Sequence, residues 1–262
     1  MMAGFSKPID NLPKAEAANT TGQRLFLRQM ATETAFDVPT PRDVVVKVIA
    51  NQPATAKAGV VLLIGGTGVL SIGPDGRLDR SFNFASRSRD YWAEKGLATF
   101  LIDAPSDHLD RRGLTLTDRL GDDHRDDLKA VIEAIRQRFG KPLSLVGFSN
   151  GTVSAVQAYT AIGGAGLKGV VLMSPVTTGN KTVMEISSGT VATPVLAVTH
   201  EADSCKWSPP GGAALKPPSF DRLSVSGGAP VIGGDCGPFS MHSYFGIERE
   251  VIHKISEWIS IQ

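Results

Sequence analysis

The five residues Gly147-Phe148-Ser149-Asn150-Gly151 constrain this chain more than any other segment. Residues 143–146, before them, are mostly apolar and predict a short buried strand, and residues 152–158, after them, predict a helix with a face of small side chains. A serine two positions from a glycine on each side, at a strand-to-helix turn, is typical of a nucleophile elbow. Glycine is needed there because the turn strains the backbone and Cβ atoms would collide with the adjoining strand and helix.

By itself, the G-x-S-x-G motif is only moderate support for a nucleophile elbow. A chain of 262 residues has roughly a one-in-ten chance of containing G-x-S-x-G at average composition. The 28 glycines of this chain raise that chance. A serine in an ordinary glycine turn is therefore the competing interpretation, and the partners of Ser149 have to decide between the two.

Composition limits the classes of protein to be considered. With 42% hydrophobic residues the chain can bury one large core, and with a formal net charge of +1 it has no basic excess for nucleic acid. We find no apolar run long enough to predict a transmembrane helix. Residues 1–14 lack the apolar segment of a secretory signal.

The rest of the chain alternates strand patterns with helix patterns. Most predicted strands are continuously apolar, as expected for strands buried on both faces, and the predicted helices 120–139 and 247–259 carry an apolar stripe at spacings of three and four. The sequence therefore predicts an α/β fold, with a mostly parallel central sheet and helices on both faces. We expect residues 1–20 to form an N-terminal arm and residues 21–262 a single domain. Strands are predicted at 24–28, 43–49, 59–64, 97–102, 143–146, 169–173, 195–199 and 222–225, and helices at 86–95, 120–139, 152–158 and 247–259.

A serine hydroxyl needs a base within hydrogen-bond reach and a group that orients the base. In folds with such an elbow the chain order is Ser, then Asp or Glu, then His. Three histidines follow Ser149. His242 is the favoured base because it lies in a loop before the last helix, from which it can reach back over the sheet. His200 is the alternative, whereas His253 falls on the polar side of the last predicted helix.

The acid that orients the base is expected in the loop after the penultimate strand of the sheet that carries Ser149. Asp203 is the favoured candidate because it lies at the apex of the loop after the strand 195–199. Glu201 and Asp235 are the alternatives, and a solvated loop carboxylate is the competing interpretation for all three.

A developing oxyanion needs two hydrogen-bond donors. The first expected donor is the backbone N–H of Asn150, directly after the serine, and the second is that of Thr67 or Gly66, in the glycine-rich loop after the strand 59–64. A dinucleotide-binding turn starting at Gly66 would need a glycine at position 71, where Ser71 stands.

Taken together, these motifs resemble those of the α/β-hydrolase superfamily. The resemblance covers about residues 20–262 and rests on the glycine loop, G-F-S-N-G, the E-A-D that follows the penultimate strand, and H-S-Y-F-G-I-E leading into the last helix. It implies an esterase- or lipase-like serine hydrolase with Ser149, Asp203 and His242 as catalytic triad. The stretch 173–195, where many relatives insert a helical cap, is short here, which implies a protein without a large cap domain.

The expected activity is therefore hydrolysis of a carboxylic ester of a small molecule through an acyl-enzyme, without metal or organic cofactor. Amide or peptide cleavage and acyl transfer use the same three residues and remain alternatives. A non-catalytic binding protein that kept the fold is a second alternative, from another class. The oligomeric state, the acyl group and the leaving group are not readable from the sequence.

The chain has two cysteines, each close to one of the candidate partners of Ser149. Cys205 lies two residues after Asp203, and Cys236 lies six residues before His242. Because both loops must converge on the serine, we expect a Cys205–Cys236 disulfide that clamps them together. Such a bond persists in an oxidising compartment, which favours a periplasmic or secreted protein, although a cytoplasmic one is an alternative.

Overall fold

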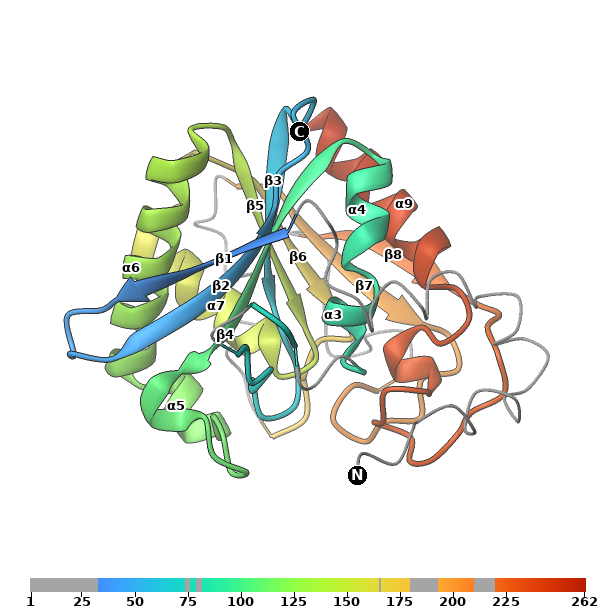
Figure 1. Ribbon diagram of the computed structural model, residues 1–262. Coiled ribbons are helices and arrows are strands. Elements are labelled where there is room, and N and C mark those ends of the chain that lie inside the picture. The colour runs from blue at the N-terminus through green and yellow to red at the C-terminus, as the bar shows by residue number, and fades with distance from the viewer. Residues whose placement is uncertain (1–32, 74–75, 79–81, 165, 180–192, 210–219) are drawn as a thin grey trace, which may run out of the picture.

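Eight strands form one sheet in the order β1-β2-β4-β3-β5-β6-β7-β8 (Figure 1). The computed structural model describes residues 33–73, 76–78, 82–164, 166–179, 193–209 and 220–262. The first two pairings, β1 with β2 and β2 with β4, are antiparallel, and the other pairings are parallel. The strands are β1 Glu33–Pro39, β2 Val45–Asn51, β3 Ala58–Leu63, β4 Leu97–Pro105, β5 Leu143–Phe148, β6 Leu167–Met173, β7 Val195–His200 and β8 Asp221–Val225.

Helices cover both faces of this sheet (Figure 1). One face carries α6 (Asp122–Phe139) and α7 (Gly151–Ile162), and the other carries α3 (Phe84–Arg87), α4 (Arg89–Glu94) and α9 (Glu248–Ile261). Each face has its own apolar cluster, and the predicted stripes of α6 and α9 supply residues to them. The predicted α/β fold, with a mostly parallel sheet between two helical layers, is thus confirmed.

The boundaries of some elements differ from the prediction. The expected helix 120–139 is divided at Gly121, whose extended backbone separates α5 (Leu116–Leu120) from α6. The expected helix 86–95 is likewise divided at Ser88, between α3 and α4. Strand β1 was not predicted, because polar and apolar residues follow one another along it without regular alternation and five of the seven are not buried. The predicted strand 24–28 and the arm 1–20 lie outside the described residues.

The topology brings distant loops to one edge of the sheet. Strands β3, β5, β6 and β7 are adjacent and parallel, so their C-terminal ends lie side by side. In open parallel sheets, ligand sites lie at this edge, outside the C-terminal ends of the strands. Within the described residues, none of the helices combines the length and the apolar character needed to cross a membrane.

The start of α4 carries two polar residues in contrasting environments. Arg89 is almost completely buried and donates hydrogen bonds to the carboxylate of Glu33, on the edge strand β1. The neighbouring Asp90 is half-buried, and its buried Oδ1 has no hydrogen-bond partner among the residues described. Burial, together with the negative charges of Glu33 and Glu94, raises the pKa of Asp90 to about 6, although the nearby Arg89 opposes this shift.

We predict that Asp90→Asn stabilises the protein at pH 8 but not at pH 4. Because the pKa of this carboxyl is raised in the folded state, its ionisation between pH 4 and pH 8 lowers the free energy of unfolding of the native protein. The amide of the variant does not ionise, so the variant does not lose this free energy. After allowance for screening by water we expect a gain of about 1 kcal/mol at pH 8. Urea unfolding of both proteins at the two pH values measures it, and an equal effect of the substitution at both would contradict the prediction.

Candidate active site

The turn from β5 into α7 places Ser149 at the sheet edge. Its backbone has φ 53°, in the left-handed region that is uncommon outside glycine. The flanking glycines are required by space: a Cβ on Gly147 would lie 2.4 Å from the carbonyl oxygen of Gly151, and one on Gly151 would lie 2.0 Å from that of Leu63. The serine side chain is partly exposed, as a residue that reacts with a substrate must be.

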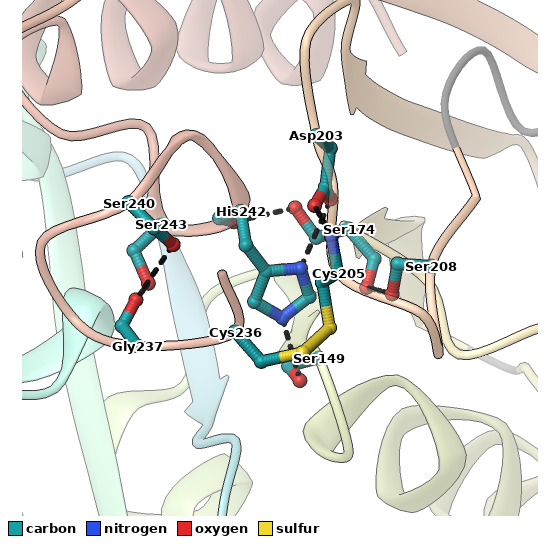
Figure 2. The surroundings of a disulfide bond; sticks show 10 residues. All are labelled: Ser149, Ser174, Asp203, Cys205, Ser208, Cys236, Gly237, Ser240, His242 and Ser243. Carbon is teal, nitrogen blue, oxygen red and sulfur yellow. Dashed lines mark hydrogen bonds and ion pairs between the residues drawn. A yellow bond between two sulfur atoms is a disulfide. The ribbon is translucent and has the colours of Figure 1, made fainter. Parts of the chain in front are cut away.

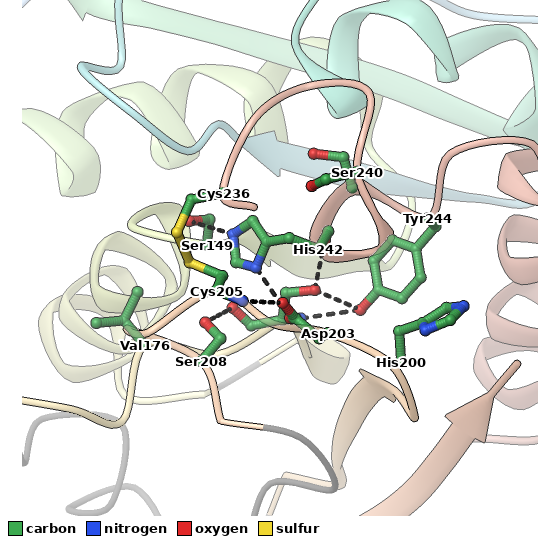
Figure 3. A network of polar contacts seen from close by, with 12 residues as sticks. Ser149, Val176, His200, Asp203, Cys205, Ser208, Cys236, Ser240, His242 and Tyr244 are labelled. Atoms are coloured by element: carbon green, nitrogen blue, oxygen red, sulfur yellow. Dashed lines mark hydrogen bonds and ion pairs between the residues drawn. A yellow bond between two sulfur atoms is a disulfide. The ribbon is translucent and has the colours of Figure 1, made fainter. Parts of the chain in front are cut away.

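Ser149, His242 and Asp203 form one hydrogen-bonded chain (Figure 3). His242 Nε2 lies 2.9 Å from the hydroxyl oxygen of Ser149, and His242 Nδ1 lies 2.9 Å from Asp203 Oδ2. A carboxylate can only accept, so Nδ1 carries the proton and Nε2 presents its lone pair to the serine hydroxyl. This is the arrangement in which an imidazole can act as a general base.

Each member of this chain comes from a different loop at the sheet edge. Asp203 follows β7, and His242 lies in the short 3-10 helix Met241–Ser243 before α9. Both side chains are almost completely buried. The second oxygen of Asp203, Oδ1, accepts the backbone N–H of Cys205 at 2.9 Å, which fixes the carboxylate plane. The ring of His242 packs on that of Phe148, with centroids 5.4 Å apart.

Two further polar residues, Ser174 and Tyr244, hold the backbone of His242 in place. The sequence analysis did not single them out. Ser174, just after β6, donates its hydroxyl to the carbonyl oxygen of His242 at 2.7 Å. The Tyr244 hydroxyl accepts the backbone N–H of Ser174 at 2.9 Å and donates to the carbonyl oxygen of Val198 at 2.9 Å. Burial raises the pKa of Tyr244 far above its usual range, so this phenol stays neutral and keeps its proton for donation.

The alternative bases and acids occupy other environments. His200 has both ring nitrogens occupied, because Nδ1 accepts the N–H of Ala202 and Nε2 donates to the carbonyl oxygen of Gly227. His253 lies on the surface of α9, 2.9 Å from a carboxylate oxygen of Glu94. Glu201 and Asp235 are exposed to solvent. Of the nominated candidates, the structure brings together Ser149, His242 and Asp203.

The residues nominated as oxyanion donors lie on two adjoining loops. Among the described residues, the backbone N–H groups of Asn150, Gly66 and Thr67 have no hydrogen-bond partner. The side chain of Asn150 ties the two loops together, since its Nδ2 donates to the carbonyl oxygen of Gly66 at 3.2 Å. Three backbone donors without a partner are thus carried by the two loops at the C-terminal ends of β3 and β5.

The disulfide between Cys205 and Cys236 is present (Figure 2). It joins the loop of Asp203 to the loop of His242, across a sequence separation of 31 residues. Figures 2 and 3 both show its sulfur atoms beside the Ser149–His242 pair. The ligand atoms of Asp203, Cys205 and His242 lie within 4.8 Å of one another, but the Cys205 sulfur is bound to Cys236 and therefore cannot offer a thiolate to a metal.

Comparison by sequence gives no match: neither a family model nor a curated protein matches this chain. Comparison by structure gives many matches. An alpha-beta serine hydrolase homologue from Coxiella burnetii has a TM-score of 0.57 and 15% identity, over 88% of this chain and 98% of that one. An esterase from Pyrobaculum calidifontis has a TM-score of 0.59 and 16% identity, over 94% and 90%. An esterase from Pyrococcus furiosus has a TM-score of 0.58 and 13% identity, over 87% and 91%.

These similarities extend over most of each chain. They show that the protein has the α/β-hydrolase fold, as its motifs predicted. At identities of 13–16% they show the fold alone.

We predict that replacing both cysteines, as Cys205→Ser with Cys236→Ser, destabilises the protein by up to about 3–4 kcal/mol, the chain-entropy value for a loop of this length. The reason is that the cross-link restricts the unfolded chain and holds two loops of the site together. Urea unfolding measures the loss. The matched control is the same measurement on the native chain with and without reductant, and unchanged stability in both comparisons would contradict the prediction.

Proposed function

We propose that this protein is a serine hydrolase that cleaves a carboxylic ester of a small molecule through an acyl-enzyme. The single observation that carries the proposal is the chain of two 2.9 Å hydrogen bonds from Ser149 through His242 to Asp203. It gives a serine that is weakly nucleophilic alone a base in the correct tautomer and an orienting carboxylate.

In the proposed reaction His242 Nε2 takes the hydroxyl proton as Ser149 Oγ attacks the ester carbonyl carbon. The carbonyl oxygen becomes an oxyanion, which accepts hydrogen bonds from the N–H of Asn150 and from that of Thr67 or Gly66. Collapse of this intermediate breaks the bond to the alcohol, which leaves with the proton from His242. Water, deprotonated by His242, then attacks the acyl-enzyme carbonyl in the same way. This step releases the acid and restores Ser149. Asp203 stays ionised throughout and orients the ring.

The structural neighbours support a hydrolase of this fold, and two of the three described above are named esterases. We therefore favour an ester over an amide. Amide hydrolysis and acyl transfer would use the same groups, with a different leaving group or acceptor. The mechanism draws on no metal or organic cofactor, because each proton and electron pair moves between the substrate, water and the three side chains.

A non-catalytic binding protein is the rival from another class. The assembled geometry argues against it, since a binding protein has no need for a serine held in left-handed backbone conformation beside an oriented imidazole. For the compartment, we infer a periplasmic or secreted protein from the disulfide at the site.

We predict that a fluorophosphonate probe adds once to the native chain and not to Ser149→Ala. The probe reacts with an activated serine and not with an ordinary one, and Ser149 alone has the imidazole of His242 on its hydroxyl. Intact-mass analysis gives the answer. The matched control is Ser256→Ala, which removes a buried hydroxyl of α9 that bonds to the carbonyl oxygen of Ile252 and leaves the residues around Ser149 in place. A well-folded native chain that forms no adduct would contradict the proposal and favour a binding function.

We also predict that Asp203→Asn lowers kcat for a 4-nitrophenyl ester by about 10³–10⁴, because the amide can donate to Nδ1 and stabilise the wrong tautomer. The exposed carboxylates provide a matched control, and Glu201→Gln should leave kcat within a factor of two. Equal losses in the two variants would exclude Asp203 as the orienting acid.

A further inference from the structure

The loop after β3, residues 64–68, is held by one short segment of the chain, residues 113–119. Leu114 donates its backbone N–H to the carbonyl oxygen of Thr67 at 2.8 Å. The guanidinium of Arg119 donates from Nη2 to the carbonyl oxygens of Gly66, at 3.2 Å, and of Ile64, at 3.4 Å. Three of the carbonyl groups of this loop, those of Ile64, Gly66 and Thr67, therefore accept hydrogen bonds from the 113–119 segment.

This orientation fixes where the N–H groups of the loop point. In a trans peptide the C=O and N–H bonds lie on opposite sides, so a carbonyl bound by Arg119 directs the N–H of the same peptide away from it. The Gly66 carbonyl belongs to the peptide whose N–H is that of Thr67. Among the described residues that N–H has no partner. The Gly66 carbonyl also accepts from Asn150 Nδ2 at 3.2 Å, so Arg119 and Asn150 together account for an amide that is left available at the edge of the sheet.

The 113–119 segment is shaped for this contact. Gly113 has φ 57°, and a Cβ there would lie 2.4 Å from the carbonyl oxygen of Thr67, so only glycine permits the approach. The helix α5 then begins with a capping box, in which Thr115 Oγ1 accepts the N–H of Asp118 and Asp118 Oδ2 accepts that of Thr115. The capped start fixes the helix from which Arg119 projects.

Arg119 has an unusual environment for a cation. It is 2% exposed and makes no ion pair with a carboxylate among the described residues, although the negative charge of Asp118 partly offsets the effect of its burial. Its other contact is from Nη1 to the Ser154 hydroxyl of α7, and its Nε has no partner in the part of the chain that the structure describes. Burial lowers the pKa of Arg119 to about 10, so the group remains protonated at neutral pH. Burying such a charge without a counterion is costly, which calls for a reason beyond packing.

We propose that Arg119 is a positioning residue for the oxyanion hole: it holds the 64–68 loop so that the Thr67 N–H faces the reacting carbonyl, and it adds a buried positive charge on the far side of that peptide. The inference rests on the proposed function. The bond to the Gly66 carbonyl polarises the peptide and strengthens its N–H as a donor. A fixed charge in a water-excluded site stabilises a developing oxyanion more than it stabilises a neutral ester.

The test compares Arg119→Lys and Arg119→Met with Arg89→Lys, a matched change at a second buried arginine that contacts Glu33 and not the site. Four quantities are measured for each folded variant: kcat and KM for a 4-nitrophenyl ester, Ki for a trifluoromethyl ketone, and the melting temperature. The ketone adds to the serine and forms an oxyanion, so its Ki reports the oxyanion hole, whereas a loss of stability alone does not change it.

We expect Arg119→Met to lower kcat and to raise Ki by about 10–100-fold each, the scale on which a small misplacement of reacting groups costs rate, with KM changed less than threefold. Arg119→Lys, which keeps the charge but not the forked donors, should fall in between. Arg89→Lys should lower the melting temperature only. Arg119→Lys is the smaller change and secures the test if Arg119→Met does not fold.

Unchanged kcat and Ki in a folded Arg119 variant would overturn the inference, as would equal losses in Arg89→Lys. These outcomes are distinct from failure of the proposed function, in which the native chain itself neither hydrolyses the ester nor forms a fluorophosphonate adduct. In that case the inference falls together with the proposal on which it rests.

Discussion

The structure depends on one close backbone contact, where the first residue of α7 passes the end of β3. A side chain on Gly151 would lie 2.0 Å from the carbonyl oxygen of Leu63, so the helix can approach the strand only with glycine there. Ser149 lies two residues before this contact, and the 64–68 loop starts directly after it. The same contact therefore sets the distance between the candidate nucleophile and the candidate oxyanion donors, which belong to strands that are neighbours in the sheet.

Each half of the candidate site rests on a buried polar group that makes no contact with Ser149 in the described structure. Next to Asp203 and His242, the Tyr244 hydroxyl joins the ends of β6 and β7, and Ser174 connects it to the backbone of His242. Under the glycine loop, Arg119 binds two backbone carbonyls. Polar groups buried in this way favour a single arrangement, because any other would leave a donor or an acceptor unpaired at a cost of about 1–3 kcal/mol.

Sequence reasoning predicted the fold class and nominated the three residues that the structure brings together, because the elbow has a local pattern and the order of its partners follows from topology. It also paired the two cysteines, since their loops had to meet. It missed β1, in which polar and apolar residues neither alternate regularly nor form a continuous apolar run. It missed Tyr244 and Arg119 as well, because their contacts span 70 and 53 residues and leave no local signature. Their roles, and those of the nominated residues, stay predictions.

The disulfide has a consequence for the integrity of the chain. Cys205 and Cys236 enclose residues 230–235, which form an exposed stretch with little regular structure, the kind of segment at which proteases cut. A cut there would leave two fragments joined through sulfur, with Asp203 on one and His242 on the other. A nicked molecule would then keep both loops in place and would separate into two bands only on a reducing gel.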